Sequence, residues 1–187
     1  MNAVRVRPAR LEDAPAIAGI HVRTWQHAYR ELLPASLLAG LDVADRTRMW
    51  EGTLASPQPR TAALVAEAGG VVVGFCSAGG ARLPGADDRE ADSTGEVYAI
   101  YVLPDAQGMG AGRALLEAAD DAMREQGFTR AILWVLAGNA PAIAFYERMG
   151  WQADGATKQE EIGGVAIEEI RYRRSLGPAG TTVEADR

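Results

Sequence analysis

The spacing of hydrophobic positions changes several times along the chain, and each change marks the end of one predicted element and the start of another. Apolar residues at every second position, or in short continuous runs, indicate strands, whereas apolar residues three or four positions apart indicate helices. Strand-like patterns cover residues 4–6, 61–67, 71–78, 96–103, 130–136 and 167–173, with 151–153 as a further candidate. Helix-like patterns follow Asp13, Ser36 and Asp42 or Asp45, and cover residues 110–126 and 140–149.

Glycines and charged residues separate these elements. Ala68, Gly69 and Gly70 join two strand-like runs, which is typical of a hairpin. Residues 79–95 combine Gly, Ala, Pro and Ser with several acidic side chains, and we expect them to form a mobile loop. Its acidic stretch is either a lid that attracts a cationic ligand or an ordinary solvated loop.

The order of the elements predicts an α/β fold, built as a mixed α+β sheet with helices on its faces. A strand, a helix and a strand follow one another from Glu96 to Leu136, so these two strands are expected to be parallel neighbours. We expect a single domain over residues 1–176. Residues 177–187 are polar and lack periodicity, and we expect a disordered tail there.

Composition excludes several classes of function. The chain has 187 residues, of which 48% are hydrophobic, and none of its apolar runs reaches the roughly 18 to 20 residues that span a bilayer. The N-terminus lacks the features of a secretory signal, so we expect a cytoplasmic protein that does not bind membranes. The net charge of −6 argues against nucleic-acid binding and is compatible with a cationic small molecule.

Few residues are available for disulfides or metals. Cys76 is the single cysteine and lies in an apolar run, which predicts a buried free thiol. A structural metal needs about four clustered ligands, whereas the chain adds only His21 and His27. We therefore expect no metal, and we interpret both histidines as packing or surface residues.

The sharpest local feature is the Gly-rich segment 107–113, between a predicted strand and a predicted amphipathic helix. Glycine lets the backbone approach a ligand closely, and unpaired amides at a helix start point toward an anion. The segment predicts a phosphate cradle, with an ordinary strand-to-helix turn as the alternative. A P-loop would need Lys and Ser or Thr where Arg113 and Ala114 stand, and a dinucleotide fingerprint would need Gly in place of Arg113.

This segment resembles the acetyl-CoA-binding motif of the GNAT superfamily of N-acetyltransferases, in which Gln or Arg, two residues, Gly, one residue and Gly or Ala follow one another. Gln107, Gly110 and Gly112 match it, and residues 139–151 resemble the family's second cofactor motif. The resemblance implies a GNAT-like acyl-CoA N-acyltransferase fold. In that fold the central mixed sheet splays between its two middle parallel strands, and helices cover both faces.

The resemblance also implies how acetyl-CoA, the co-substrate, is bound without a metal. The backbone of three consecutive strand residues would pair with the pantetheine arm, a loop would hold the pyrophosphate, and a short helix would line the far side. These cofactor-binding residues are Ile100, Tyr101 and Val102, then Gln107, Gly108, Met109, Gly110, Ala111, Gly112 and Arg113, and finally Asn139, Ala142 and Tyr146. A backbone amide near Tyr101 would polarise the thioester carbonyl.

Two residues match the family's catalytic positions. Tyr146 matches the tyrosine that protonates the departing thiolate, with aromatic packing as the alternative role. Glu96, 11 residues before Gln107, matches the general base of some members, and the alternative is a solvated glutamate. Trp25 and Tyr29 lie where family members build the acceptor pocket, although core packing alone also explains them.

The implied function is transfer of an acetyl group from acetyl-CoA to a primary amine of a small molecule, by direct attack in a ternary complex. Two alternatives stay open: a protein acetyltransferase acting on an N-terminal or lysine amine, and a non-catalytic acetyl-CoA sensor. Cys76 is not expected to act as a nucleophile, because no histidine neighbours it in the sequence. The resemblance is also compatible with a homodimer.

Overall fold

The computed structural model, which describes residues 3–83, 88–162 and 164–177, contains a seven-stranded mixed sheet. The strands lie in the order β1-β2-β3-β4-β5-β7-β6, and the pairing of β4 with β5 is parallel while the others are antiparallel. The strands are β1 (Val4–Pro8), β2 (Ala62–Ala68), β3 (Val71–Gly80), β4 (Thr94–Val102), β5 (Arg130–Leu136), β6 (Gln152–Ile162) and β7 (Val165–Ser175). The predicted hairpin and the predicted parallel pair are both confirmed.

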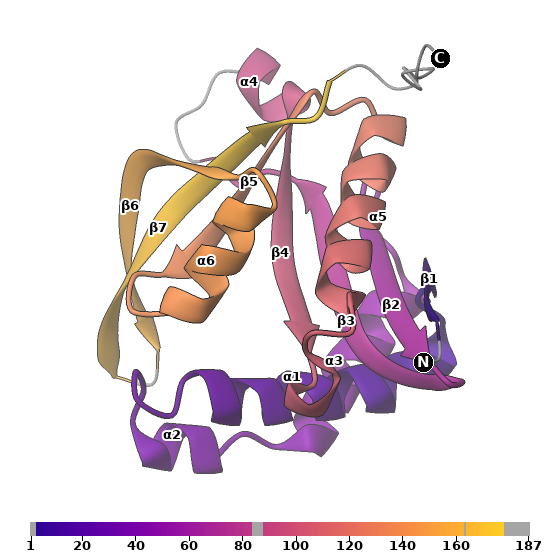
Figure 1. The fold of residues 1–187 in the computed structure, drawn as a ribbon, viewed down its shortest axis with the longest axis vertical. Helices are drawn as coiled ribbons and strands as arrows, with labels where there is room; N and C mark the ends of the chain where they lie inside the picture. Colours follow the sequence, from indigo (N-terminus) through magenta and orange to yellow (C-terminus); the bar gives the residue numbers. More distant parts are fainter. Residues whose placement is uncertain (1–2, 84–87, 163, 178–187) are drawn as a thin grey trace.

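Helices cover both faces of this sheet (Figure 1). They are α1 (Ala14–Ala28), α2 (Ala35–Ala39), α3 (Val43–Ala55), α4 (Asp88–Ser93), α5 (Ala111–Glu125) and α6 (Ala140–Arg148), with short 3-10 turns at Leu11–Asp13 and Pro104–Ala106. Alternate residues of the strands point to opposite faces. Cys76 accordingly packs in the core under α5, whereas its neighbour Phe75 packs with Ile17 and Trp50 under α1 and α3. The expected fold class is confirmed.

The two middle strands separate along their length. β4 and β5 pair only from Thr94 to Val97 and from Arg130 to Leu133. Beyond Val97, β4 continues as the partner of β3 and β5 continues as the partner of β7, so each keeps an antiparallel neighbour while leaving the other. A β-bulge at Tyr98, which has no register partner on β3, adds a local bend to β4 at the point of separation. The predicted splay is present.

The segment 79–95 is more ordered than a loop. β3 extends through Gly80, α4 occupies Asp88–Ser93 and β4 begins at Thr94, while residues 84–87 lie outside the described part of the chain. A side chain at position 79 would meet the Tyr98 hydroxyl, because a Cβ built there lies 2.7 Å from it. Gly79 therefore makes room beside β3 for the Tyr98 side chain.

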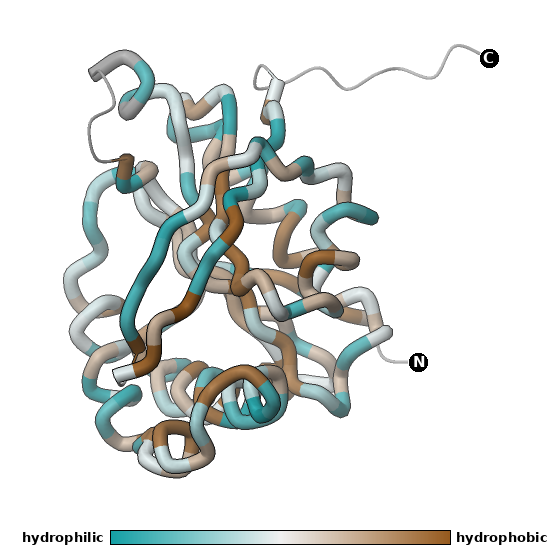
Figure 2. Tube along the Cα trace, turned by 90° about the vertical axis from the view of Figure 1, so that its left-hand side faces the viewer, coloured by the Kyte–Doolittle hydropathy of each residue, from teal (hydrophilic) through white to brown (hydrophobic). Residues whose placement is uncertain are grey.

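The last two strands are longer than their sequence patterns indicate. Most of β6 is polar and lies at the edge of the sheet, and Figure 2 shows long hydrophilic stretches along the β6–β7 hairpin. Because an edge strand buries few side chains, its hydrophobic alternation is weak. Of the expected disordered tail, Gly177 follows the last strand, and residues 178–187 lie outside the described residues.

Three observations concern the cysteine, possible metal sites and possible membrane-spanning helices. Cys76 is a buried free cysteine, as predicted. Within residues 3–83, 88–162 and 164–177, no group of three or more His, Cys, Asp or Glu side chains is placed to hold a metal ion. Over the same residues, no helix is both long enough and apolar enough to cross a membrane.

We expect Asp120 to make stability depend on pH. This residue of α5 is 2% exposed. One of its carboxyl oxygens lies 2.8 Å from the Arg174 guanidinium, and the other has no partner among the described residues. Burial, opposed by Arg174 and Arg124, raises the pKa of Asp120 to about 6. Because this value lies above that of an unfolded aspartate, the folded state is destabilised by this group as the pH rises from about 4 to about 6.

The corresponding variant is Asp120→Asn, studied by urea unfolding between about pH 4 and pH 6. Across that range the wild type should lose at most roughly 2 kcal/mol of unfolding free energy relative to the variant. Asp105→Asn, which alters an exposed carboxyl group that does not act on Asp120, serves as the control and should follow the wild-type profile. Parallel profiles for the wild type and Asp120→Asn would show that Asp120 does not titrate in this range.

Candidate active site

The Gly-rich turn after β4 has the geometry of an anion site. Gly108 and Gly110 have φ angles of 78° and 87°, which favour glycine, and a Cβ built at either residue meets no atom within 4 Å. The first helical hydrogen bond of α5 runs from the Ala114 amide to the Gly110 carbonyl, at 3.0 Å. The amides of Ala111, Gly112 and Arg113 therefore point out of the helix start, where they suit a phosphate.

The first turn of α5 lies close to α6. A Cβ built on Gly112 would be 3.4 Å from the Phe145 ring and 3.8 Å from the Val102 side chain, which are ordinary packing distances. Gln107 and Met109 are exposed on the outer side of the turn. Arg113 is also exposed and pairs with Glu117 at 2.8 Å.

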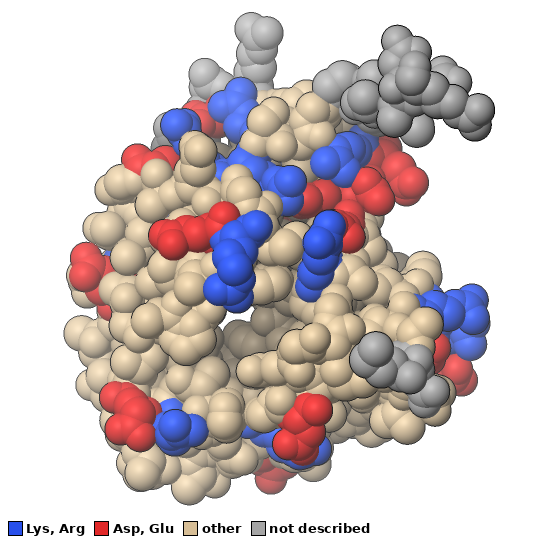
Figure 3. All heavy atoms as spheres, viewed as in Figure 1, with Lys and Arg blue, Asp and Glu red and all other residues tan. Residues whose placement is uncertain are grey.

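The face that α5 and α6 cover is hollowed near its centre. Figure 3 shows this hollow, with Lys and Arg side chains gathered beside it. A hollow next to the helix start of α5 offers an anionic ligand both backbone amides and nearby cations.

The edge of β4 that faces the separated β5 is open to an extended ligand. Ile100, Tyr101 and Val102 pair with β3 on one side, and none of them pairs with β5 on the other. Their side chains divide between the faces, because Ile100 and Val102 pack toward α5 while Tyr101 packs toward α1. The open edge thus leaves backbone N–H and C=O groups available, as in a sheet that accepts an added strand.

Tyr146 lies on α6, close to the separation. Its side chain is buried, with ring centroids 6.4 Å from those of Trp151 and of Tyr172. Burial raises the pKa of Tyr146, and Tyr101 and Cys76 add to the effect, so the phenol stays protonated and can donate a proton.

Asn139 begins α6, and its role differs from that of a simple lining residue. Its Oδ1 atom accepts a hydrogen bond from the Ala142 amide at 3.3 Å, which caps the helix. Asn139 is buried and Ala142 is half-buried. The residue that matches the second cofactor motif therefore fixes the start of the helix that carries Tyr146.

Glu96 is buried, so the interpretation as a solvated glutamate is wrong. The residue is 3% exposed, and its side chain accepts two hydrogen bonds from Arg82, one from the amide at 2.9 Å and one from the guanidinium at 2.8 Å. Arg82 also stacks over Tyr98, 4.4 Å from the ring centroid. Glu96 pairs with Ile132 one position before the strands separate, so its carboxylate is held at the base of the split.

Aromatic side chains from α1 and β4 gather on the opposite face. The rings of Trp25 and Tyr29 meet edge to face at 5.2 Å, and the His21 ring lies 5.5 Å from Trp25 and 5.3 Å from Tyr101. Burial raises the pKa of Tyr29, with further contributions from Tyr101 and then Tyr146. Phenols from α1, β4 and α6 therefore come within electrostatic reach of one another at the split.

The environments of two of these residues, Arg82 and His21, are not evident from the sequence. Arg82 lies 14 positions before its partner Glu96, in the segment expected to be a loop, so nothing local links them. His21 was interpreted as a packing or surface residue and does pack, but both of its ring nitrogens are buried without a partner among the described residues. Its position in the predicted helix does not indicate its aromatic neighbours, because Phe75 and Tyr101 come from distant strands.

Comparisons with known proteins agree on one family. A family model described as the acetyltransferase (GNAT) family matches residues 22–151. An uncharacterized N-acetyltransferase of Bacillus subtilis, YuaI, is 34% identical over 167 residues, which cover 89% of this chain and 90% of that protein.

Two solved structures share the fold over nearly their whole length. YncA, an acetyltransferase of Salmonella typhimurium solved with acetyl-CoA, is 25% identical with a TM-score of 0.68, and the match covers 99% of this chain and 100% of that one. A ribosomal-protein-alanine N-acetyltransferase of Brucella melitensis is 26% identical with a TM-score of 0.68, over 91% of this chain and 99% of that one.

Proposed function

The chain belongs to the GNAT family of acetyltransferases, and from this premise we propose that it transfers the acetyl group of acetyl-CoA to a primary amine of a small molecule. It is an acetyl-CoA-dependent N-acetyltransferase by family. The observation that carries the proposal is the separation of β4 from β5, with a helix start at one end and the side chains of Glu96 and Tyr146 beside it. We also propose that it acts in the cytoplasm and that it can form a homodimer.

The co-substrate would lie along the open edge of β4. Backbone groups of residues 100–102 would pair with its pantetheine amides, and the amides of residues 108–113 would bind its pyrophosphate. Gln107 begins this turn, and Asn139 and Ala142 line the opposite side through α6. The open space beside Gly108 and Gly110 fits this arrangement.

Transfer needs a free amine and a protonated leaving group. In the proposed reaction the amine nitrogen bonds to the acetyl carbon as the carbon–sulfur bond breaks, without a covalent acyl-enzyme. Glu96 takes a proton from the amine, directly or through water, and Tyr146 gives its phenolic proton to the departing thiolate. A backbone amide near Tyr101 polarises the carbonyl oxygen.

A small acceptor is favoured over a protein because the acceptor side is partly closed. Side chains of the β6–β7 hairpin, including Ile162, Val165 and Ile167, pack with Leu33 and Leu38 from the α1–α2 region. Trp25 and Tyr29 belong to the same cluster, so packed side chains of the β6–β7 hairpin lie against the proposed acceptor side. A long peptide would have to open it.

The second candidate is a protein N-terminal acetyltransferase, which the likeness to the Brucella melitensis protein favours. One assay separates the candidates: release of free thiol from acetyl-CoA with small amines and with alanine-initiated peptides. Release with small amines alone supports the first proposal, and release with peptides alone supports the second. Binding of acetyl-CoA with no release would support a sensor.

Replacing Gly110 by Ala should weaken acetyl-CoA binding, because the left-handed φ angle strains any larger residue and distorts the amides that would bind phosphate. We expect roughly a 10-fold higher dissociation constant by calorimetry. Gly127→Ala is the matched control, since Gly127 has a φ angle of 88° at the other end of α5. Equal affinities of the two variants for acetyl-CoA would show that the amides of residues 108–113 do not bind its pyrophosphate.

Replacing Tyr146 by Phe should lower kcat by roughly 100-fold, because the thiolate loses its proton donor. Affinity for acetyl-CoA should change little, since the ring remains. Tyr172→Phe is the control. The Tyr172 ring on β7 neighbours that of Tyr146, and its hydroxyl donates to Glu147 at 3.0 Å. If Tyr146→Phe has the kcat of the wild type, Tyr146 has only a packing role and does not protonate the thiolate.

Replacing Glu96 by Gln should lower kcat/KM most strongly near pH 7, where an alkyl amine is almost entirely protonated. Activity should recover in part toward about pH 10, as the free amine becomes abundant. Gln keeps one of the two oxygens that accept from Arg82, so it can retain one of the two hydrogen bonds. If the pH profile of the variant has the wild-type shape, Glu96 is not the base.

A further inference from the structure

A groove of about 700 Å³ lies on the face of the sheet that α5 and α6 do not cover. It is lined by Ile132 on β5, whose neighbour Leu133 points to the other face and packs in the core under α5. Its walls include Thr94 at the start of β4 and Leu83 before α4. A groove of this size is in the range that holds a small-molecule ligand.

This groove borders the proposed base. Ile132 is the register partner of Glu96 on β4 and of Arg173 on β7. Residues that pair across neighbouring strands point to the same face, so the side chains of Glu96, Ile132 and Arg173 form one row. Two strand spacings, about 10 Å, separate the backbones of Glu96 and Arg173. Leu83 directly follows Arg82, which binds the Glu96 carboxylate.

Two arginines of the groove have no opposite charge within the protein. Arg130 and Arg173 both line it, and neither forms an ion pair or a side-chain hydrogen bond within the described part of the chain. Arg130 pairs with Ser175 and Arg173 pairs with Ile132, so the two arginines are diagonal neighbours on adjacent strands, within reach of long side chains. Like charges this close repel each other, and an anion bound between them would relieve the repulsion.

The other two arginines of the lining are already neutralised. Arg171 pairs with Asp154 at 2.9 Å, and Arg174 pairs with the buried Asp120 at 2.8 Å. Glu90, the remaining carboxylate of the lining, forms no ion pair with Arg130 or Arg173 among the described residues. The groove therefore offers a ligand two guanidinium groups that the protein does not balance.

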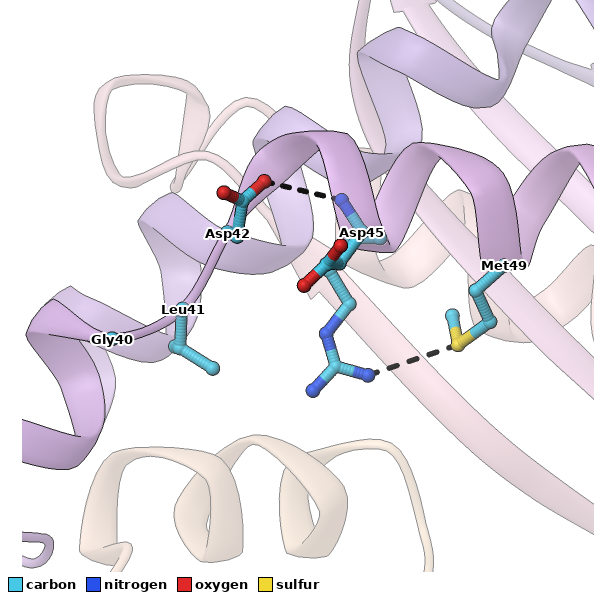
Figure 4. A pocket seen from close by; sticks show the side chains of 6 residues that line it. Gly40, Leu41, Asp42, Asp45 and Met49 are labelled. Atoms are coloured by element: carbon cyan, nitrogen blue, oxygen red, sulfur yellow. Dashed lines mark hydrogen bonds between the residues drawn. The ribbon is translucent and has the colours of Figure 1, made fainter.

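The smaller hollow between α2 and α3 differs in both respects. Its volume is about 220 Å³, and its two aspartates are engaged by the protein itself. Asp42 accepts a hydrogen bond from the Asp45 amide at 3.1 Å, as Figure 4 shows, and Asp45 pairs with Arg48. These contacts fix the start of α3, and no lining residue of this hollow pairs with the strand that carries Glu96.

We propose that the acceptor amine carries a phosphate monoester, and that Arg130 and Arg173 bind this phosphate in the groove while the amine lies at Glu96. A phosphate monoester has a charge of about −1.5 to −2 at neutral pH, which matches two unpaired guanidinium groups. A carboxylate would leave one of them unmatched. Guanidinium groups also bind phosphate oxygens in two-point contacts. This inference rests on the proposed transferase function and names the class of its acceptor.

The test compares amino alcohols with their phosphate monoesters in the thiol-release assay. Carbon chains of two to six atoms vary the separation of amine and phosphate, because Ile132 lies between Glu96 and Arg173. Aminoalkanoates of the same lengths replace the phosphate by a carboxylate, and putrescine replaces it by a cation. The wild type should prefer at least one phosphate monoester to its parent alcohol in kcat/KM by roughly 10- to 100-fold, the value of one charged hydrogen-bonded contact.

Variants of the two arginines decide whether they carry that preference, and both residues are exposed, so the fold should tolerate the changes. Arg130→Gln and Arg173→Gln should each lower the ratio of phosphate to alcohol by roughly 10-fold, through a higher KM for the phosphate. The double variant should bring the ratio close to one, with acetyl-CoA affinity unchanged by calorimetry. Arg173→Lys should keep part of the preference. Arg5→Gln removes an exposed arginine of β1, at the opposite edge of the sheet, and should retain the full ratio.

The failures are distinguishable. A wild-type ratio near one for every chain length, or a full ratio in the double variant, would overturn the phosphate site and leave the transferase intact. A higher kcat/KM for an aminoalkanoate or for putrescine than for every phosphate monoester would do the same. If no amine of any kind releases thiol although acetyl-CoA binds, the proposed function fails, and the phosphate site of its acceptor fails with it.

Discussion

The parting of β4 from β5 is the constraint on which the rest of the structure depends. The two strands share four register pairs and then diverge, because each has a full antiparallel partner elsewhere and because the bulge at Tyr98 bends β4. If β4 and β5 stayed paired along their whole length, the backbone N–H and C=O groups of β4 would all be hydrogen-bonded within the sheet. None of them would then be available to a ligand. By separating, the sheet exposes backbone groups in its interior without leaving them at an outer edge open to aggregation.

The groups of the site come from elements that this divergence brings together. The helix start of α5 follows directly from β4, α6 follows from β5, and the strands carry Glu96 and Tyr101 at and beyond the point of separation. Burial then sets their chemistry: it keeps Tyr146 protonated and His21 neutral, and Arg82 holds the Glu96 carboxylate in place by two hydrogen bonds. Glu96 and Tyr146 are thus both buried, the first with a fixed carboxylate and the second with a protonated phenol.

How much of this could be predicted depends on whether a feature is local in sequence. The turn 107–113 and the start of α6 at Asn139 are local, since turn glycines and helix caps act within a few residues, and both were predicted from short motifs. Arg82 was missed because the fold, not the sequence, brings it to its partner Glu96. The polar strand β6 was largely missed because an edge strand needs no hydrophobic alternation. The separation of β4 from β5 was expected only from the family resemblance, because no periodicity in the sequence encodes it.

The most direct test of the central claim is a crystal structure of the protein with coenzyme A. The account predicts the pantetheine arm between β4 and β5, its amides paired with the backbone of residues 100–102, the pyrophosphate on the amides of residues 108–113, and the sulfur within hydrogen-bond reach of the Tyr146 hydroxyl. Coenzyme A bound elsewhere, with the edge of β4 left open, would contradict it.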